Sequence, residues 1–193
     1  MKKVFLTLAV VMMAMVANAQ LWMGGSFGFN SSKDSPTDNP VYLYSIAPEV
    51  GYSLAPRWDI AVGLGYSGSY EKDVTTLPIL GDITTVNTTS QLSVEPYVRY
   101  TAFDLGKVGF FIDGGVKYST GTNKTSINNE SSATSYNTFF VGFQPGVKFA
   151  ASDKITFAAR IGSLGYAKSS DGSSIFGVNV NNSAFTLGLW WAF

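Results

Sequence analysis

The 193-residue sequence contains no cysteine and no histidine, and only 13% of its residues are charged. The lack of cysteine excludes thiol catalysis, disulfide bonds and zinc–thiolate sites. The lack of histidine excludes His-based catalytic dyads and triads as well as His metal ligands. Lys and Arg number 13, as do Asp and Glu, and this neutral, charge-poor composition argues against nucleic-acid binding. With 46% hydrophobic and 15% aromatic residues, the chain is too apolar to be disordered.

The N-terminus has the pattern of a secretory signal peptide. Lys2 and Lys3 precede an apolar run from Val4 to Val16, and Ala17-Asn18-Ala19 is a small-x-small cleavage pattern. The alternative, an N-terminal anchor helix, needs about 20 apolar residues, which is more than this run supplies. We therefore expect residues 1–19 to be removed and the mature chain, 20–193, to be exported. Two destinations remain open, namely secretion as a soluble protein and the outer membrane of a diderm bacterium.

Most of the mature chain alternates between apolar and small or polar residues, which is the pattern of β-strands. The alternation predicts eight strands, at about 21–30, 43–54, 58–70, 90–101, 108–120, 135–150, 154–167 and 182–193. The connections between them are alternately long and short, and the long ones are 31–42, 71–89, 121–134 and 168–181. All short turns therefore fall on the side of the two termini, an asymmetry typical of transmembrane barrels.

Three segments share the pattern Pro-x-Val-x-aromatic, and they begin at Pro48, Pro96 and Pro145. Each lies on a strand that enters a short turn, so the repeated unit is a β-hairpin. Because proline has no N–H to donate to a neighbouring strand, we expect a bulge or a locally missing hydrogen bond at each of the three.

The orientation of the two faces separates two kinds of barrel. A soluble lipocalin-like carrier has its apolar face inside, whereas a membrane barrel has it outside. The less apolar face here consists mostly of Gly, Ala, Ser and Thr, unlike the Lys- and Glu-rich surface of a soluble protein. Aromatic residues also gather near both strand ends, with Trp58, Phe149, Trp191 and Phe193 at one end and Phe27, Phe29, Tyr44, Tyr66, Tyr70, Tyr118 and Tyr136 toward the other. Both observations favour the membrane barrel.

These features resemble the small bacterial outer-membrane β-barrel proteins of the OmpA-transmembrane-domain and OmpX kind, and especially the outer-membrane β-barrel (porin-like) families of Bacteroidota. The resemblance rests on the signal peptide, the hairpin repeat and the terminal segment 187–193. It implies an all-β, eight-stranded antiparallel up-and-down transmembrane barrel with short periplasmic turns and long extracellular loops. It also implies that Phe193, with Trp191 and Leu189 as alternating partners, forms the signal read by the barrel-assembly machinery. We expect a monomer in contact with outer-membrane lipid.

In this orientation seven charged residues face the lumen: Glu49, Glu95, Arg99, Asp113, Lys117, Lys148 and Arg160. An eight-stranded barrel is just wide enough for side chains, and an unpaired charge inside it costs several kcal/mol. We therefore expect a paired network that plugs the lumen. The alternative is a gate in a narrow porin-like channel for ions or small solutes. Glu95 and Arg99 lie two pleats apart on one strand, so each is expected to pair with a neighbouring strand.

The long connections are the expected sites of contact with an extracellular protein or surface ligand. The second one carries an apolar cluster, Leu77, Pro78, Ile79 and Leu80, which either packs on the loop or barrel rim or forms a contact patch. Residues 83–94 continue to alternate, which predicts strands that project beyond the membrane and could accept a foreign strand.

Enzymatic activity is not expected, because the chain has no histidine to act as a base. A Ser–Lys pair remains conceivable, but no spacing indicates one. Residues 63–68 match G-x-G-x-x-G, but they end an alternating strand where a dinucleotide site needs a helix to begin. We therefore expect no cofactor, and a structural or surface-interaction role is the function that the sequence favours.

Overall fold

The computed structural model describes residues 21–34, 39–77, 81–128, 130–179 and 185–193, and the expected signal peptide lies outside them. Within these ranges the chain forms strands, and no helix is long and apolar enough to cross a membrane. The strands are β1 (Leu21–Asp34), β2 (Asn39–Ala55), β3 (Trp58–Leu77), β4 (Gly81–Asp104), β5 (Val108–Ile127), β6 (Glu130–Ala150), β7 (Ile155–Ile161), β8 (Ser163–Ser169), β9 (Ser174–Asn179) and β10 (Phe185–Ala192).

All strand pairs are antiparallel, and the sheet closes on itself. β1 to β6 pair in sequence order, β6 pairs with both β7 and β8, and β10 pairs with both β7 and β1. Counting β7 with β8 and β9 with β10 as single interrupted strands, the ring has eight strands. The predicted fold class is thus confirmed. Closure matters because every strand then has a hydrogen-bonding neighbour on each side near the short turns.

The seventh barrel strand, predicted as continuous over 154–167, is divided between β7 and β8 at Gly162. Gly162 has φ of +74°, a left-handed conformation that residues with a Cβ rarely adopt. Arg160 pairs with Gly146 and Leu164 pairs with Phe143, so one extra residue is accommodated opposite β6. This is a β-bulge, and it shifts the alternation by one residue, so that Ile161 before it and Leu164 after it both face outward.

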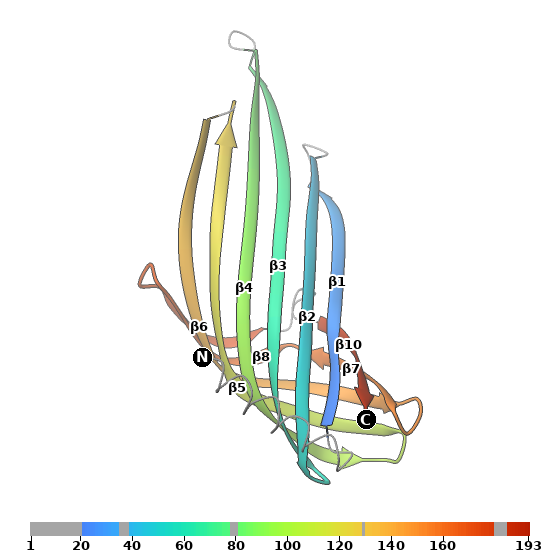
Figure 1. Ribbon diagram of the computed structural model, residues 1–193. Helices are drawn as coiled ribbons and strands as arrows, with labels where there is room; N and C mark the ends of the chain where they lie inside the picture. The colour runs from blue at the N-terminus through green and yellow to red at the C-terminus, as the bar shows by residue number, and fades with distance from the viewer. Residues whose placement is uncertain (1–20, 35–38, 78–80, 129, 180–184) are drawn as a thin grey trace, which may run out of the picture.

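The connections at the end opposite the termini are mostly paired strand rather than loop. β3 and β4 remain paired from Trp58 with Tyr100 out to Leu77 with Gly81, and β5 and β6 pair out to Ile127 with Glu130. Figure 1 shows these hairpins rising far above the short-turn end. The predicted connections 71–89 and 121–134 are therefore too long, and the strands beside them are longer than predicted. Ser, Thr and Asn are common in loops, but here they alternate and pair across strands.

Each of the three repeat prolines interrupts pairing on one side, as the sequence predicted. Pro48 pairs with Gly25 on β1, whereas the β2–β3 ladder omits Ala47 and Pro48. Pro96 pairs with Val62 on β3, whereas the β4–β5 ladder omits Glu95 and Pro96. At these two sites the register is the same before and after the gap, so a hydrogen bond is missing without a bulge.

Pro145 differs from the other two prolines. It pairs with Ile112 on β5, and its other side faces the β7–β8 bulge described above. The missing donor and the extra residue thus occur opposite each other at the third repeat.

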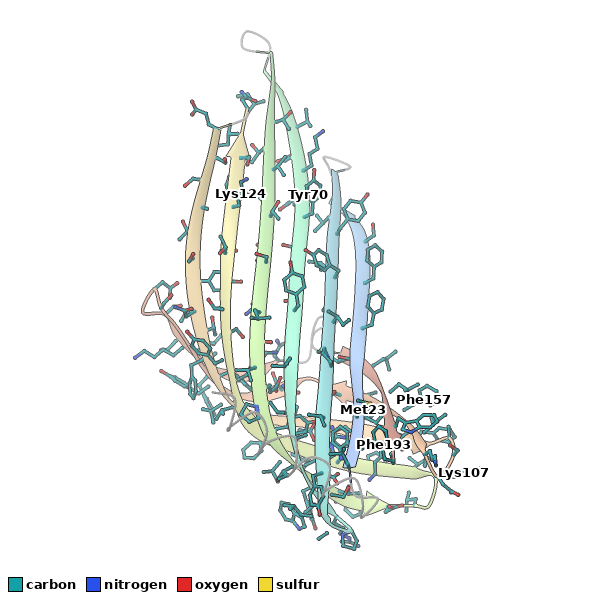
Figure 2. The ribbon with its side chains drawn as sticks, in the orientation of Figure 1. Met23, Tyr70, Lys107, Lys124, Phe157 and Phe193 are labelled. Carbon is teal, nitrogen blue, oxygen red and sulfur yellow. The ribbon has the colours of Figure 1, made fainter. Side chains whose placement is uncertain are left out.

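The apolar face points outward, as in a membrane barrel. On β10 the side chains of Leu189 and Trp191 are 44% and 42% exposed, whereas Trp190 between them is 5% exposed. Met23, Phe157 and Phe193 belong to the same outward set toward the short-turn end (Figure 2). The lipocalin-like orientation is therefore excluded.

One aromatic departs from the predicted outer girdle. Tyr136 has the same alternation phase as Gln144 of β6, and its ring packs where a Cβ on Gly121 would lie. It therefore belongs to the inward face. Tyr44, Tyr66 and Tyr70 remain on the outward face, where Tyr44 stacks near Tyr66 with ring centres 6.1 Å apart.

Candidate functional site

Five inward side chains meet across the lumen: Glu49 on β2, Tyr97 and Arg99 on β4, Asp113 on β5 and Arg160 on β7. We call these five residues the septum. Period-two alternation puts each of them on the inward face of its strand. The ring then brings together residues as distant in sequence as Glu49 and Arg160.

Asp113 lies at the centre of the septum and binds both arginines. Arg99 donates from Nε and Nη2 to the two oxygens of Asp113, at 2.7 and 2.8 Å. Arg99 and Asp113 are direct cross-strand partners, so the pairing of the adjacent strands β4 and β5 is enough to bring them together. Arg160 Nε donates to Asp113 Oδ2 at 2.8 Å. One carboxylate thus holds two guanidinium groups from two different walls of the barrel.

Glu49 completes the septum from the other side. Arg160 Nη1 and Nη2 donate to its two oxygens at 3.0 and 2.8 Å. The Tyr97 hydroxyl donates to Glu49 Oε2 and accepts from Arg160 Nη2. Glu49, Arg99 and Asp113 are at most 6% exposed. Two carboxylates and two guanidinium groups balance, so the buried septum carries no net charge and meets the pairing requirement for buried ions.

A layer of aromatic rings supports the septum on the side of the short turns. The Arg99 guanidinium lies 4.1 Å from the ring centre of Phe111 and 4.5 Å from that of Trp190, within cation–π range. Trp22 meets Trp190 edge to face, with ring centres 6.1 Å apart. A Cβ on Gly51, the cross-strand partner of Trp22, would overlap the Trp22 ring, so this position needs glycine.

Sequence reasoning did not single out these aromatic residues or Tyr97 as part of the site. The signal was available, because Trp22, Phe111 and Trp190 share the alternation phase of the charged inward residues. An aromatic residue in the inward phase of a membrane barrel indicates lumen packing rather than lipid contact.

The remaining predicted lumen charges lie outside the septum. Lys117 Nζ is 3.6 Å from Glu95 Oε2, and Gln144 Nε2 donates to Glu95 Oε1 at 3.0 Å. Lys148 Nζ donates to Thr101 Oγ1 at 3.0 Å. Glu95 and Arg99 therefore each pair with neighbouring strands, as their spacing predicted. The seven predicted residues form a central group of four, one pair and one separate lysine.

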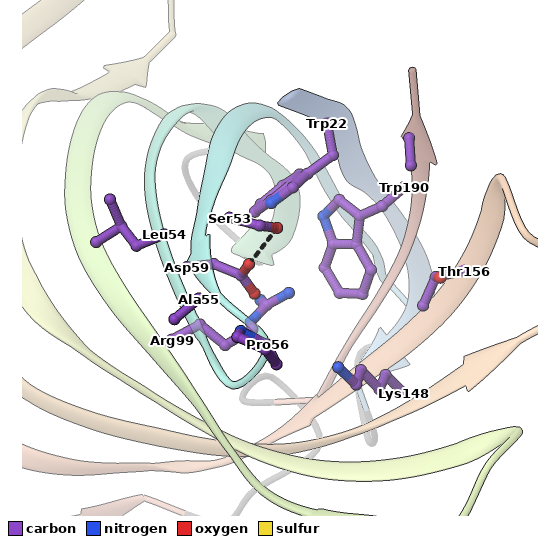
Figure 3. A pocket seen from close by; sticks show the side chains of 11 residues that line it. Trp22, Ser53, Leu54, Ala55, Pro56, Asp59, Arg99, Lys148, Thr156 and Trp190 are labelled. Carbon is purple, nitrogen blue, oxygen red and sulfur yellow. Dashed lines mark hydrogen bonds between the residues drawn. The ribbon is translucent and has the colours of Figure 1, made fainter. Parts of the chain in front are cut away.

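The septum lies between two cavities. The lower cavity, of about 520 Å³, opens toward the short turns and is lined by Trp22, Asp59, Arg99, Lys148 and Trp190 among others (Figure 3). The upper cavity, of about 360 Å³, lies on the side of the long hairpins, and Arg160 contributes to its floor. Arg99 lines the lower cavity and Arg160 the upper one, and both bind Asp113, so this layer of paired charged side chains lies between the two spaces.

The other predicted site residues lie on the outside or at the hairpin end. Leu189, Trp191 and Phe193 are outward and between 42% and 44% exposed, and the Phe193 N–H donates to the Leu21 carbonyl at 3.1 Å. Leu77 ends β3 opposite Gly81, while Pro78, Ile79 and Leu80 lie outside the described residues. In the described part of the chain, no acidic residues cluster in a way that would hold a metal ion.

The whole chain apart from its first three residues, 4–193, matches the family described as outer membrane protein beta-barrel domain. The chain belongs to this family. The short-turn end of this outer-membrane barrel is therefore periplasmic, and the long hairpins are extracellular. A comparison with curated protein sequences gives no match.

Solved structures with a similar chain course include three bacterial proteins. Neisserial surface protein A has a TM-score of 0.47 and 14% identity, with 91% of this chain and 97% of that one covered. A major outer membrane protein from Thermus thermophilus has a TM-score of 0.47 and 12% identity, covering 90% and 99%. The attachment invasion locus protein Ail of Yersinia pestis has a TM-score of 0.44 and 15% identity, covering 90% and 97%.

The septum is expected to contribute strongly to stability. Asp113→Asn leaves two buried guanidinium groups without their shared anion and should lower the free energy of unfolding by about 3–5 kcal/mol. Urea unfolding in lipid vesicles, followed by tryptophan fluorescence, measures this loss. The matched control is Glu95→Gln, expected to cost about 1 kcal/mol or less because the Glu95–Lys117 pair is partly exposed. Equal losses in both variants would contradict a special role for the septum.

Proposed function

We propose that this outer-membrane barrel is a structural or surface-interaction protein, with a closed lumen and with extracellular hairpins that contact a protein or surface ligand. The septum is the observation that carries the first part. Its members bind one another across the lumen, and Arg160 uses Nε, Nη1 and Nη2 in these contacts. A solute would have to break several charge-assisted hydrogen bonds to pass, which favours closure over transport.

The long hairpins support the second part of the proposal. β3 to β6 form a paired sheet beyond the septum, and polar side chains bridge its strands. Thr89 Oγ1 donates to Asn123 Oδ1 at 3.0 Å, and Thr125 Oγ1 donates to Asn87 Oδ1 at 2.9 Å. Such a surface is ordered before any partner arrives, which lowers the entropic cost of binding. The apolar contact patch proposed for this contact is Leu77, Pro78, Ile79 and Leu80, of which Leu77 ends β3 and the other three lie outside the described residues.

The second candidate function is a narrow channel for ions or small solutes. The observation in its favour is that solvent-accessible cavities lie on both sides of the septum. Rearrangement of one layer of side chains would join them. In this case the septum would be a gate.

The C-terminal strand supports a proposal about assembly. Leu189, Trp191 and Phe193 form an alternating outward row on the strand that closes the barrel against β1. We propose that the barrel-assembly machinery recognises this row. The mature domain, residues 20–193, would then insert as a monomer.

Closure of the lumen predicts electrical silence. The folded wild-type protein in a planar bilayer is expected to show no discrete conductance steps, because the septum spans the lumen. The double variant Glu49→Ala with Arg160→Ala removes one charge of each sign, retains the Arg99–Asp113 pair and should produce small, reproducible steps. Heat-modifiable gel migration verifies folding. Discrete steps from the wild-type protein would instead make transport the leading function.

The surface-interaction role predicts adhesion that depends on the hairpin. Bacteria displaying the wild-type barrel should adhere to at least one protein in a panel of immobilised serum and matrix proteins. Replacing residues 74–84 by an Asn-Gly turn shortens the β3–β4 hairpin while the pair Asp73–Thr85 remains, and should reduce adhesion about tenfold. The single substitution Ile79→Ser leaves the barrel strands unchanged and tests the patch alone. Lack of adhesion by the wild type would leave a purely structural role.

The assembly proposal predicts a defect confined to cells. Phe193→Ala should reduce the amount of folded barrel in the outer membrane several-fold, because the terminal aromatic row is shortened. Refolding of the same variant from urea into detergent should match the wild type, since this process needs no assembly machinery. Val94→Ala, another outward position, serves as the control. An equal defect in both settings would indicate lost stability rather than lost recognition.

A further inference from the structure

The upper cavity is lined mostly by polar side chains. Six of its hydroxyl and amide side chains come from five strands: Ser26 on β1, Ser45 on β2, Ser67 on β3, Gln91 and Ser93 on β4, and Thr186 on β10. They lie on the extracellular side of the septum, since Ser93 is one pleat and Gln91 two pleats farther along β4 from Glu95 toward the long hairpins. A molecule from outside the cell would reach them before the septum.

These six side chains make no hydrogen bond to any described residue, in contrast to the fully paired septum below them. A hydroxyl donates one hydrogen bond and accepts two, and an amide donates two and accepts two. Polar groups in an enclosed space are satisfied by protein, water or ligand. The upper cavity therefore presents a concentrated set of neutral donors and acceptors to whatever enters it.

The charged residues at the floor are already committed to each other. Arg160 binds Asp113 and Glu49, and Glu95 binds both Lys117 and Gln144. The floor thus has no excess charge of either sign with which to capture a phosphate, a carboxylate or a metal cation. Neutral hydroxyl and amide groups in this number suit a ligand that is itself rich in hydroxyls.

Two glycines make room for the cavity. Gly28 is the cross-strand partner of Ser45, and Gly65 is the partner of Ser93. A Cβ at either glycine would clash with the Oγ atom of its partner serine. Glycine therefore lets the hydroxyls turn into a space of about 360 Å³, which falls within the size range of small-molecule sites, about 300–1,000 Å³.

We propose that the upper cavity binds a small neutral polyhydroxylated ligand, a monosaccharide unit, from the extracellular side. This site is independent of the proposed contacts made by the hairpin tips. The sugar arrives either as a free monosaccharide or as the end of a surface glycan, and both offer the same hydroxyls. The septum forms the floor, so the ligand binds without passing through the barrel.

Ligand-observed NMR and calorimetry on the folded full-length barrel test this proposal. The detergent is an amine oxide, because maltoside detergents carry sugars of their own. The probes are glucose, galactose, mannose and N-acetylglucosamine, followed by their methyl glycosides, which mimic a glycan end. Saturable binding of any of the four sugars supports the site, and tighter binding of a methyl glycoside identifies a glycan end as the source. Absence of saturable binding for all of them, or binding of inorganic phosphate alone, overturns the proposal.

Variants locate the binding in the upper cavity. Ser93→Phe fills the cavity and should abolish sugar binding, whereas Val94→Phe places the same ring on the lipid face of the same strand and should leave binding unchanged. If Ser93→Phe does not fold, Ser67→Ala with Gln91→Ala removes hydrogen-bonding groups without adding volume. This pair should raise the dissociation constant about tenfold or more. Binding that survives both changes would place the sugar elsewhere and overturn the proposal.

Discussion

The carboxylate of Asp113, shared between Arg99 and Arg160, is the interaction on which the interior of this barrel depends. Arg99 comes from the adjacent strand, whereas Arg160 comes from a strand that does not neighbour β5. Arg160 then continues to Glu49, 111 residues away in the sequence. A single buried anion therefore ties together walls that the backbone ladder does not connect directly. The same contacts lie between the two cavities of the lumen.

This interior is possible because the barrel has inverted faces. Lipid solvates the outward Leu, Phe and Trp side chains, so the chain does not need an apolar core in the usual sense. Its buried space is then available for polar residues, provided that they satisfy one another. Small residues make this space usable. Gly51 admits Trp22 beneath the septum, and Gly65 frees Ser93 above it.

The lower and upper parts of the barrel have different chemistry. Toward the periplasm, aromatic rings pack around Arg99 and leave a mixed cavity with Asp59 and Lys148 at its wall. Toward the outside, hydroxyl and amide groups replace the rings, and the strands continue into polar hairpins. The septum separates these two environments, so binding from outside and structural closure do not compete for the same residues.

Much of the architecture could be predicted from the sequence. Period-two alternation indicated the strands and, with the small inward residues, the orientation of the faces. The alternately long and short connections indicated which turns share a side, and the three prolines indicated where pairing is interrupted. Inward phase alone identified seven inward charged residues, which include the four of the septum. Strand ends were less predictable, because Ser, Thr and Asn in 83–94 are compatible with both a loop and a polar strand.

The tertiary structure decided which of these residues meet. Alternation gives the face of a residue but not its height relative to distant strands, which follows from register and barrel shear. For this reason the contact of Arg160 with Glu49 and the separation of Lys148 from the septum needed the closed ring. The sequence by itself determined a membrane barrel with a charged interior. Only the closed sheet, by setting the register of eight strands at once, decided that four of these charges form one paired layer between two cavities.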